Sequence, residues 1–217
     1  KYGDLIMGSN GPDDYLRPFN VQRIDSTDVI VENTNQRLQS PSGYTQMNIM
    51  QKLKLKPSKN WMFEYGFHYS ETSDYARYDR HIRYKNGLPR YGEWNYGPQK
   101  WLMNNLNIIH KSSSKAFDEL TIRAAHQFFE ESRHDRNFND IQKSHHTENV
   151  NAYSLNFDFH KSLSTKQQLF YGFESIYNDV TSFGEIQDIS TGQITKGLSR
   201  YPESNWQSYA AYLTYNF

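Results

Sequence analysis

Strict alternation of tryptophan, phenylalanine or tyrosine with other residues in the stretch WMFEYGFHYS, residues 61–70, is the feature that most constrains how this chain can fold. Successive side chains of a β-strand point to opposite faces, so this pattern predicts a strand with one aromatic face. The aromatic positions are Trp61, Phe63, Tyr65, Phe67 and Tyr69. A second alternating segment lies at 102–111, and a long polar loop separates the two. This arrangement indicates a hairpin of a membrane β-barrel.

The same period-two pattern recurs along the chain and predicts about seven strands. Each segment is about ten residues long, which is the length a tilted membrane-spanning strand needs. Residues 1–9 form a first strand or its end in this interpretation, which would make an eighth. The seven predicted strands cover 44–56, 61–70, 102–111, 119–130, 151–160, 169–177 and 208–217.

The predicted connections alternate between short and long. Outer-membrane barrels have short periplasmic turns and long extracellular loops, whereas soluble β-sandwiches show no such alternation. We therefore expect the short turns in the periplasm, the long loops outside the cell, and a last strand that runs toward the periplasm. The turns cover 57–60, 111–118 and 161–167, and the loops cover 71–100, 131–148 and 178–205.

Composition excludes several classes of protein. The mean hydropathy is −0.91, and no window approaches the roughly 20 apolar residues of a spanning helix. A membrane strand is apolar only at alternate positions, so low hydropathy is compatible with a barrel. The formal net charge is zero, which argues against a nucleic-acid partner. The chain has no cysteine, which excludes disulfides, thiol catalysis and cysteine metal sites.

The polar loop at 75–101 holds the candidate ligand-binding residues. Arginine and aromatic side chains together suit anionic, aromatic or sugar ligands, through bidentate hydrogen bonds and stacking. The alternative is that these groups hold the loop itself together, with Asp74 and Asp79 as ion-pair partners. The candidates are Arg77, Tyr78, Arg80, His81, Arg83, Tyr84 and Trp94.

Other clusters of reactive residue types indicate no catalytic or metal site. The histidines at 81, 134, 145 and 146 lack metal-site spacing, and no cysteine or acidic cluster completes a ligand set. Arg133 and Arg136 interleave with carboxylates at 130, 131, 135 and 140, which predicts ion pairs. No nucleophile–histidine–acid pattern, phosphate loop or EF-hand occurs. We therefore expect no enzyme, no catalytic residues, no cofactor and no metal.

Polar residues occupy the strand positions opposite the apolar stripe. In a barrel these side chains would line the lumen, and in a soluble sandwich they would face solvent. Charge on a lipid-facing position is costly, so the segregation favours the barrel. The positions are Glu64, His68, Arg123, Gln127, Asn156, Asp158 and Glu174.

Five segments resemble the central barrel of TonB-dependent outer-membrane receptors. They keep the order of that family and extend over nearly the whole chain. The longest is ARYDRHIRYKNGLPRYGEWNYGPQKWLMNNL at 76–106. The others are NGPDDYLRP at 10–18, FEESRHDRNF at 129–138, LFYGFESIYNDVTS at 169–182 and SRYPESNWQSYAAYLTY at 199–215.

The resemblance implies an outer-membrane location in a Gram-negative cell and a large barrel of about 22 strands that encloses a plug domain. It implies uptake of a scarce nutrient, such as a ferric siderophore, haem, cobalamin or a glycan. The TonB complex would drive this uptake by pulling on the plug. Residues 1–217 show no recognisable plug and no TonB box, so we expect them to be a partial barrel domain in contact with outer-membrane lipid.

Two alternatives remain open from the sequence. The chain could be a complete small barrel with a structural or adhesive role, which would suit its aromatic final segment. It could also be a soluble all-β carbohydrate-binding module that uses exposed tryptophan and tyrosine.

Overall fold

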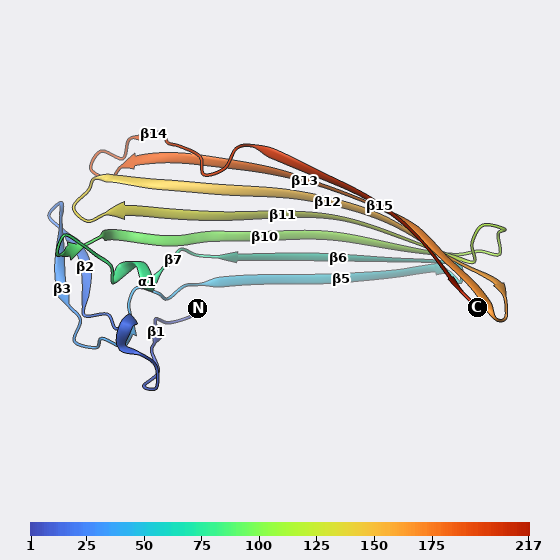
Figure 1. Ribbon diagram of the computed structural model, residues 1–217, viewed down its shortest axis with the longest axis horizontal. Coiled ribbons are helices and arrows are strands. Elements are labelled where there is room, and N and C mark those ends of the chain that lie inside the picture. Colours follow the sequence, from blue (N-terminus) through green and yellow to red (C-terminus); the bar gives the residue numbers. More distant parts are fainter.

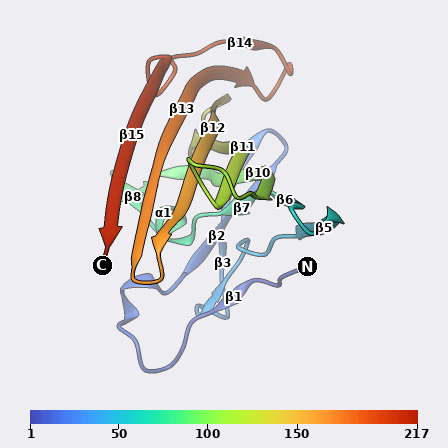
Figure 2. The same ribbon diagram turned by 90° about the vertical axis from the view of Figure 1, so that its right-hand side faces the viewer.

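A computed structural model describes all residues, 1–217, and consists almost entirely of antiparallel β-structure (Figure 1). Seven long strands follow one another in a single meander, and each pairs with its neighbours in sequence. The sheet curves but does not close, as Figure 2 shows. The strands are β5 (Gln46–Ser58), β6 (Trp61–Thr72), β10 (Tyr91–Lys111), β11 (Glu119–Asn137), β12 (Gln142–Ser164), β13 (Gln167–Asp188) and β15 (Ser204–Asn216).

The strand register gathers the predicted apolar positions on one face. Directly opposed residues of an antiparallel pair share a face, and Leu106 of β10 lies opposite both Tyr65 of β6 and Ala124 of β11. Phe157 of β12 likewise lies opposite Ile122 and Phe173. No element of the chain covers this face, and Leu213 at the edge is 73% exposed. The predicted all-β fold is confirmed, and Asn104, opposite Phe67 and His126, is a polar position on the apolar face.

The opposite face carries a row of polar side chains that bond across the strands. Lys54 Nζ lies 2.8 Å from Glu64, which also accepts a hydrogen bond of 3.2 Å from Asn107. Further along the row, Asn156 donates to Glu174 at 2.7 Å. Arg123 pairs with Asp158, which accepts a second bond from Tyr212. The polar positions thus bond across the strands in three separate groups.

The two ends of the sheet differ. At the end that we call the turn end, brief connections join β5 to β6, β10 to β11 and β12 to β13, as the alternation predicts. The opposite end, called the loop end, carries the connections from β6 to β10, from β11 to β12 and from β13 to β15, together with the N-terminal 45 residues (Figure 1).

The strands continue well into the segments predicted as long loops. β11 and β12 leave only residues 138–141 between them, and β13 extends to Asp188 before a connection that contains β14 (Ile194–Lys196). Period-two alternation marks a strand only where one face is apolar. Beyond that zone both faces can meet water, so polar residues on both sides conceal the strand. The predicted loop boundaries 131–148 and 178–205 were therefore too wide, and so was 71–100, because β10 already begins at Tyr91.

The N-terminal residues add no eighth strand to the sheet, which corrects that expectation. They fold at the loop end into two short ladders, β1 with β4 and β2 with β3. Glycine and proline at 8, 11, 12 and 18 interrupt this segment before a long alternation can build up. The bounds are β1 (Leu5–Ile6), a 3₁₀ turn (Asp13–Tyr15), β2 (Phe19–Ile24), β3 (Thr27–Glu32) and β4 (Leu38–Gln39).

The connection between β6 and β10 folds against the same end of the sheet. It contains β7 (Tyr75–Ala76), which pairs with β10, and a single helical turn, α1 (Tyr78–His81). A small ladder of β8 (Tyr84–Lys85) and β9 (Leu88–Pro89) follows. None of the helices has the length and apolar character that crossing a membrane demands.

Candidate ligand-binding site at the loop end

A bulge in β10 turns two aromatic side chains toward the polar face of the sheet. The pairing between β10 and β11 slips between Tyr96 and Gln99, where Gly97 has a φ of +102°. Without the extra residue, the even positions 94 and 96 would continue the apolar face of Leu102 and Leu106. With it, Trp94 and Tyr96 lie opposite odd-numbered β11 residues, which belong to the polar face. Bulges commonly re-aim side chains in this way.

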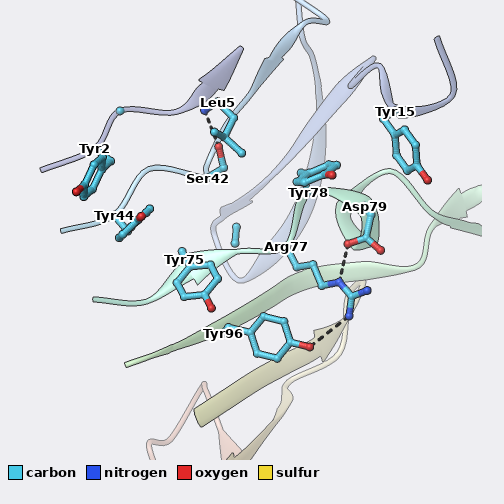
Figure 3. Close-up of a pocket in the computed structure, with 12 residues that line it drawn as sticks. Tyr2, Leu5, Tyr15, Ser42, Tyr44, Tyr75, Arg77, Tyr78, Asp79 and Tyr96 are labelled. Carbon is cyan, nitrogen blue, oxygen red and sulfur yellow. Dashed lines mark hydrogen bonds and ion pairs between the residues drawn. The ribbon is translucent and has the colours of Figure 1, made fainter. Parts of the chain in front are cut away.

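A cavity of about 700 Å³ opens beside Tyr96, between the N-terminal segment and the β6–β10 connection. Its walls are mainly tyrosine rings, as Figure 3 shows. Centroid distances of 4.7, 5.7 and 6.0 Å separate successive members of a row that runs through Tyr2, Tyr44, Tyr75 and Tyr96. We call this the tyrosine row. The remaining polar and aromatic lining includes Tyr15, Ser42, Arg77, Tyr78 and Asp79.

The only cation and the only carboxylate of the cavity wall neutralise each other. Arg77 Nε donates to Asp79 at 2.6 Å, and its Nη1 donates to the hydroxyl of Tyr96 at 3.3 Å (Figure 3). The other tyrosine hydroxyls of the wall make no hydrogen bond within the chain. Faces of aromatic rings and free hydroxyls suit a ligand with flat apolar surfaces and polar edges.

Three arginine side chains surround Trp94 next to the cavity. The guanidinium carbons of Arg77, Arg80 and Arg133 lie 5.2, 5.7 and 5.7 Å from the centre of the indole ring. Trp94 itself is only 5% exposed and packs edge-on against Tyr96 at 4.9 Å. We call Trp94 and these three arginines the tryptophan–arginine cluster. Its cation–π contacts place three guanidinium groups around one indole ring.

His81 supports the cluster from behind and is not available to a ligand. It is 6% exposed, and its Nε2 lies 3.0 Å from the carbonyl oxygen of Trp94. Burial, reinforced by the positive charge of Arg17, lowers the pKa of His81 to about 4. The ring is therefore neutral at neutral pH, and Nε2–H donates to the carbonyl.

The structure divides the seven candidate residues into three groups. Arg77, Arg80 and Trp94 come together in the cluster, with His81 buried beneath it. Tyr78 lines the cavity and meets Tyr15 edge-on at 6.0 Å. Tyr84 packs instead against Phe19 at 5.1 Å, and Arg83 is exposed outside the cavity. Ligand binding by these residues stays a prediction.

Sequence reasoning did not select most of the cavity wall. Tyr2, Tyr15 and Tyr44 come from segments that contact the loop only through the tertiary fold. Tyr96 could not be assigned to the site from the sequence, because only the bulge places its side chain on the polar face. The high tyrosine content of the chain, 17 residues, is compatible with a tyrosine-lined site, but composition alone assigns none of these residues to it.

Ion pairs also stabilise this end, as the alternative interpretation of the charged residues predicted. Asp79 lies between Arg77 and Arg80, while Lys100 pairs with Glu130 at 2.8 Å. Asp74, in contrast, forms no ion pair. No group of three or more histidine, cysteine, aspartate or glutamate residues is placed to hold a metal ion.

His134 and His145 form a separate pair on the apolar-face side of β11 and β12. His134 and His145 lie directly opposite each other, and their Nδ1 atoms are 2.6 Å apart. Nε2 of His134 contacts the carbonyl of Gly97 at 2.6 Å, which fixes the proton of that ring on Nε2. His145 must then donate from its own Nδ1. The pair therefore braces the bulge at Gly97.

Comparison with known proteins places the chain by its fold. No protein-family model and no curated protein matches the sequence. Among solved structures, it resembles the copper transporter OprC, with a TM-score of 0.58 and 12% identity. The match covers 81% of this chain and 26% of OprC, so the chain spans about a quarter of the length of that transporter. At this level of identity the similarity concerns the fold alone, that of a β-barrel wall.

Proposed function

We propose that this chain forms part of the barrel of a TonB-dependent outer-membrane receptor, which takes up a scarce nutrient through its lumen. The loop end would face the outside and capture the ligand. The observation that carries the proposal is the placement of a ligand-sized cavity at the loop end, near residues that share the polar face of the sheet. The apolar face on the other side supplies the surface for outer-membrane lipid.

The two faces support transport better than adhesion or a structural role. A small barrel needs no large cavity at its mouth, since side chains fill its interior. Here the polar row leads away from the cavity toward the turn end, and its members Glu64, Arg123 and Glu174 provide hydrogen-bonding groups along the way. The fold of OprC, named as a copper transporter, is consistent with this function.

The nutrient would be a ferric siderophore, haem, cobalamin or a glycan, as for the receptors that the sequence resembles. Energy would come from the TonB complex acting on a plug domain supplied elsewhere in the protein. The chain's contribution would be capture at the mouth and a share of the lumen wall. Buried His81, with its nitrogen bonded to the Trp94 carbonyl, makes no contribution to haem ligation in this proposal.

Cysteine labelling in intact cells tests the orientation. The chain has no cysteine of its own, so any labelling within it comes from the single cysteine that is introduced. Tyr84→Cys, at the loop end, should react with a membrane-impermeant maleimide. Its matched control, Lys166→Cys on the turn between β12 and β13, should react only after the outer membrane is permeabilised. Labelling of both sites, or of neither, in intact cells would contradict the proposed topology.

Uptake measurements test the transport role. Cells that express the full-length protein should accumulate its nutrient, and accumulation should stop when the TonB protein is deleted or the proton gradient is collapsed. Growth on a panel of limiting iron, cobalamin and glycan sources identifies the nutrient. A protein that sits in the outer membrane but supports no energy-dependent growth on any source would be a structural or adhesive barrel.

A further inference from the structure

We propose that the loop-end site selects ligands that carry an anionic group, with Arg80 and Arg133 as the residues that bind it. This inference rests on the proposed function and specifies its substrate class. The tyrosine row would bind the flat body of the ligand, and the tryptophan–arginine cluster its carboxylate or phosphate. The distinguishing observation is that Arg80 and Arg133 are held in place without using their hydrogen-bond donors.

Neither guanidinium makes a side-chain hydrogen bond within the chain. Arg80 Nε is 3.9 Å from Asp79, and Arg133 Nε is 3.7 Å from Asp135. Both Nε atoms are buried without a hydrogen-bond partner. Buried polar groups are nearly always bonded, and an arginine offers five N–H donors. Arg77, in contrast, donates hydrogen bonds to Asp79 at 2.6 Å and to Tyr96 at 3.3 Å, as expected of an arginine with a structural role in this loop.

The environment of these two arginines suits an anion. Their side chains are 27% and 22% exposed, so the outer nitrogens remain accessible while Trp94 fixes the planes of the groups. His146 lies opposite Arg133 on β12, and its buried Nδ1 also lacks a hydrogen-bond partner. An anion there would accept charge-assisted bonds from pre-positioned forks, the geometry in which arginine binds carboxylate and phosphate best.

The cluster and the cavity are continuous, so one ligand can reach both. Tyr96 and Arg77 belong to the cavity wall, and both contact Trp94. Because Arg77 is neutralised by Asp79, the cavity itself offers no free charge to an anion. The anionic group would therefore sit at the cluster, and the uncharged part of the ligand would lie along the tyrosine row.

Matched pairs of probes test the selectivity on the full-length protein in detergent, by calorimetric titration. One pair is 2,3-dihydroxybenzoate and its amide, and the other is trigalacturonate and its methyl ester. We expect the acid of at least one pair to bind about tenfold or more tightly than its neutral partner, because it gains charge-assisted bonds. The pair that responds shows whether the body is an aromatic ring or a sugar.

The double variant Arg80→Gln/Arg133→Gln should lose this preference and bind acid and neutral probe alike. The control Arg83→Gln removes the same charge from an exposed position in the same loop and should keep the preference. If the double variant does not assemble, the single variant Arg133→Gln serves, together with the salt dependence of the wild type. Affinity for the acid should fall as salt rises.

Equal binding of acid and neutral probes by the wild type would overturn the inference, as would the absence of binding in both pairs. A preference that survives the double substitution would also overturn it. These failures are distinct from failure of the proposed function. If cysteine labelling and uptake succeed while the acids show no preference, only the anion site is wrong.

Discussion

At the scale of single residues, the loop end depends on one buried ion pair. Asp28 of β3 accepts hydrogen bonds of 2.7 and 2.9 Å from Arg136 of β11, and 2.7 Å from the backbone of Asn139. Burial alone would raise the pKa of Asp28, but the bonds from Arg136, Asn139 and Arg23 outweigh it and hold the pKa low. This contact fastens the N-terminal segment, and with it Tyr2 and Tyr44, to the sheet.

Replacing Asp28 with asparagine should detach that segment. The change removes the Asp28 charge from Arg136, whose side chain is 1% exposed and which then keeps only Glu93, at 3.1 Å, as a counter-ion. The cost should therefore stay below about 3–5 kcal/mol, the cost of a buried charge left fully unpaired. We expect faster proteolysis and hydrogen exchange of residues 1–45 while the long strands stay protected. Glu119→Gln is the control, because its pair with Lys111 is open to solvent, and such pairs contribute about 1 kcal/mol or less. Equal protection in both variants would contradict this role.

The lowered pKa of His81 predicts how the loop end responds to acid. Its pKa of about 4 in the folded chain lies below the ordinary value of 6.5, so the unfolded loop takes up a proton first. The contribution of neutral His81 to the stability of the folded state is fully present above pH 6.5. It is lost as the pH falls toward 4, and the total loss is about 3 kcal/mol. Hydrogen exchange around α1 should accelerate in that window.

The variant His81→Gln provides the comparison. Glutamine can donate an amide N–H to the Trp94 carbonyl but does not titrate, so exchange around α1 should become insensitive to pH between 4 and 6.5. If the wild-type ring titrates near 6.5 by NMR, the buried, neutral state assigned to His81 is wrong.

At the scale of the elements, neighbouring positions of one strand should differ sharply in what they tolerate. Leu106 of β10 lies on the apolar face and Asn105 on the polar face, and both are exposed within the chain. Leu106→Arg would place a charge in lipid at a cost of about 2–4 kcal/mol. Asn105→Arg would place it in the aqueous lumen. We expect the first to reduce assembly into heat-modifiable barrel and the second to have little effect.

The same logic explains how far the fold could be predicted from sequence. Where one face meets lipid, the alternation of Tyr65, Leu106 or Phe157 with polar neighbours is a strong signal, and these strands were placed correctly. Beyond the apolar zone, residues 131–137 and 142–148 remain strand without that alternation. Backbone pairing alone holds them, and it leaves little trace in the pattern of side chains.

The candidate site was predictable only in part, for reasons that the bulge illustrates. Trp94, Arg77 and Arg80 are close in sequence, so an aromatic and basic loop identified them. Tyr96 needed knowledge of the one-residue slip at Gly97, where a Cβ would lie 2.7 Å from the carbonyl oxygen of Ser73. A Gly-Pro pair in a strand indicates an irregularity, but it does not tell which face the following residues adopt. Arg133 and Tyr44 needed the tertiary fold.

At the scale of the whole molecule, the sheet has two long edges that nothing in the chain pairs. β5 bonds only to β6, and β15 bonds only to β13. In water such edges can bond to solvent, but in the hydrocarbon core of a membrane each unpaired backbone group costs several kcal/mol. A wall with these faces can therefore exist in lipid only if further strands bond to both edges.

This requirement makes a prediction about the 217-residue chain expressed by itself. It should give no monomeric, heat-modifiable band when refolded into detergent or lipid, whereas the full-length protein should. If the edge strands of two copies pair with each other, cross-linking should reveal oligomers. In that case the second molecule supplies the backbone hydrogen bonds that the edges lack. A protease-resistant monomer in lipid would instead require β5 and β15 to meet, and the loop-end cavity would then form the mouth of a small barrel. The two results thus separate the wall of a large transporter from a closed barrel.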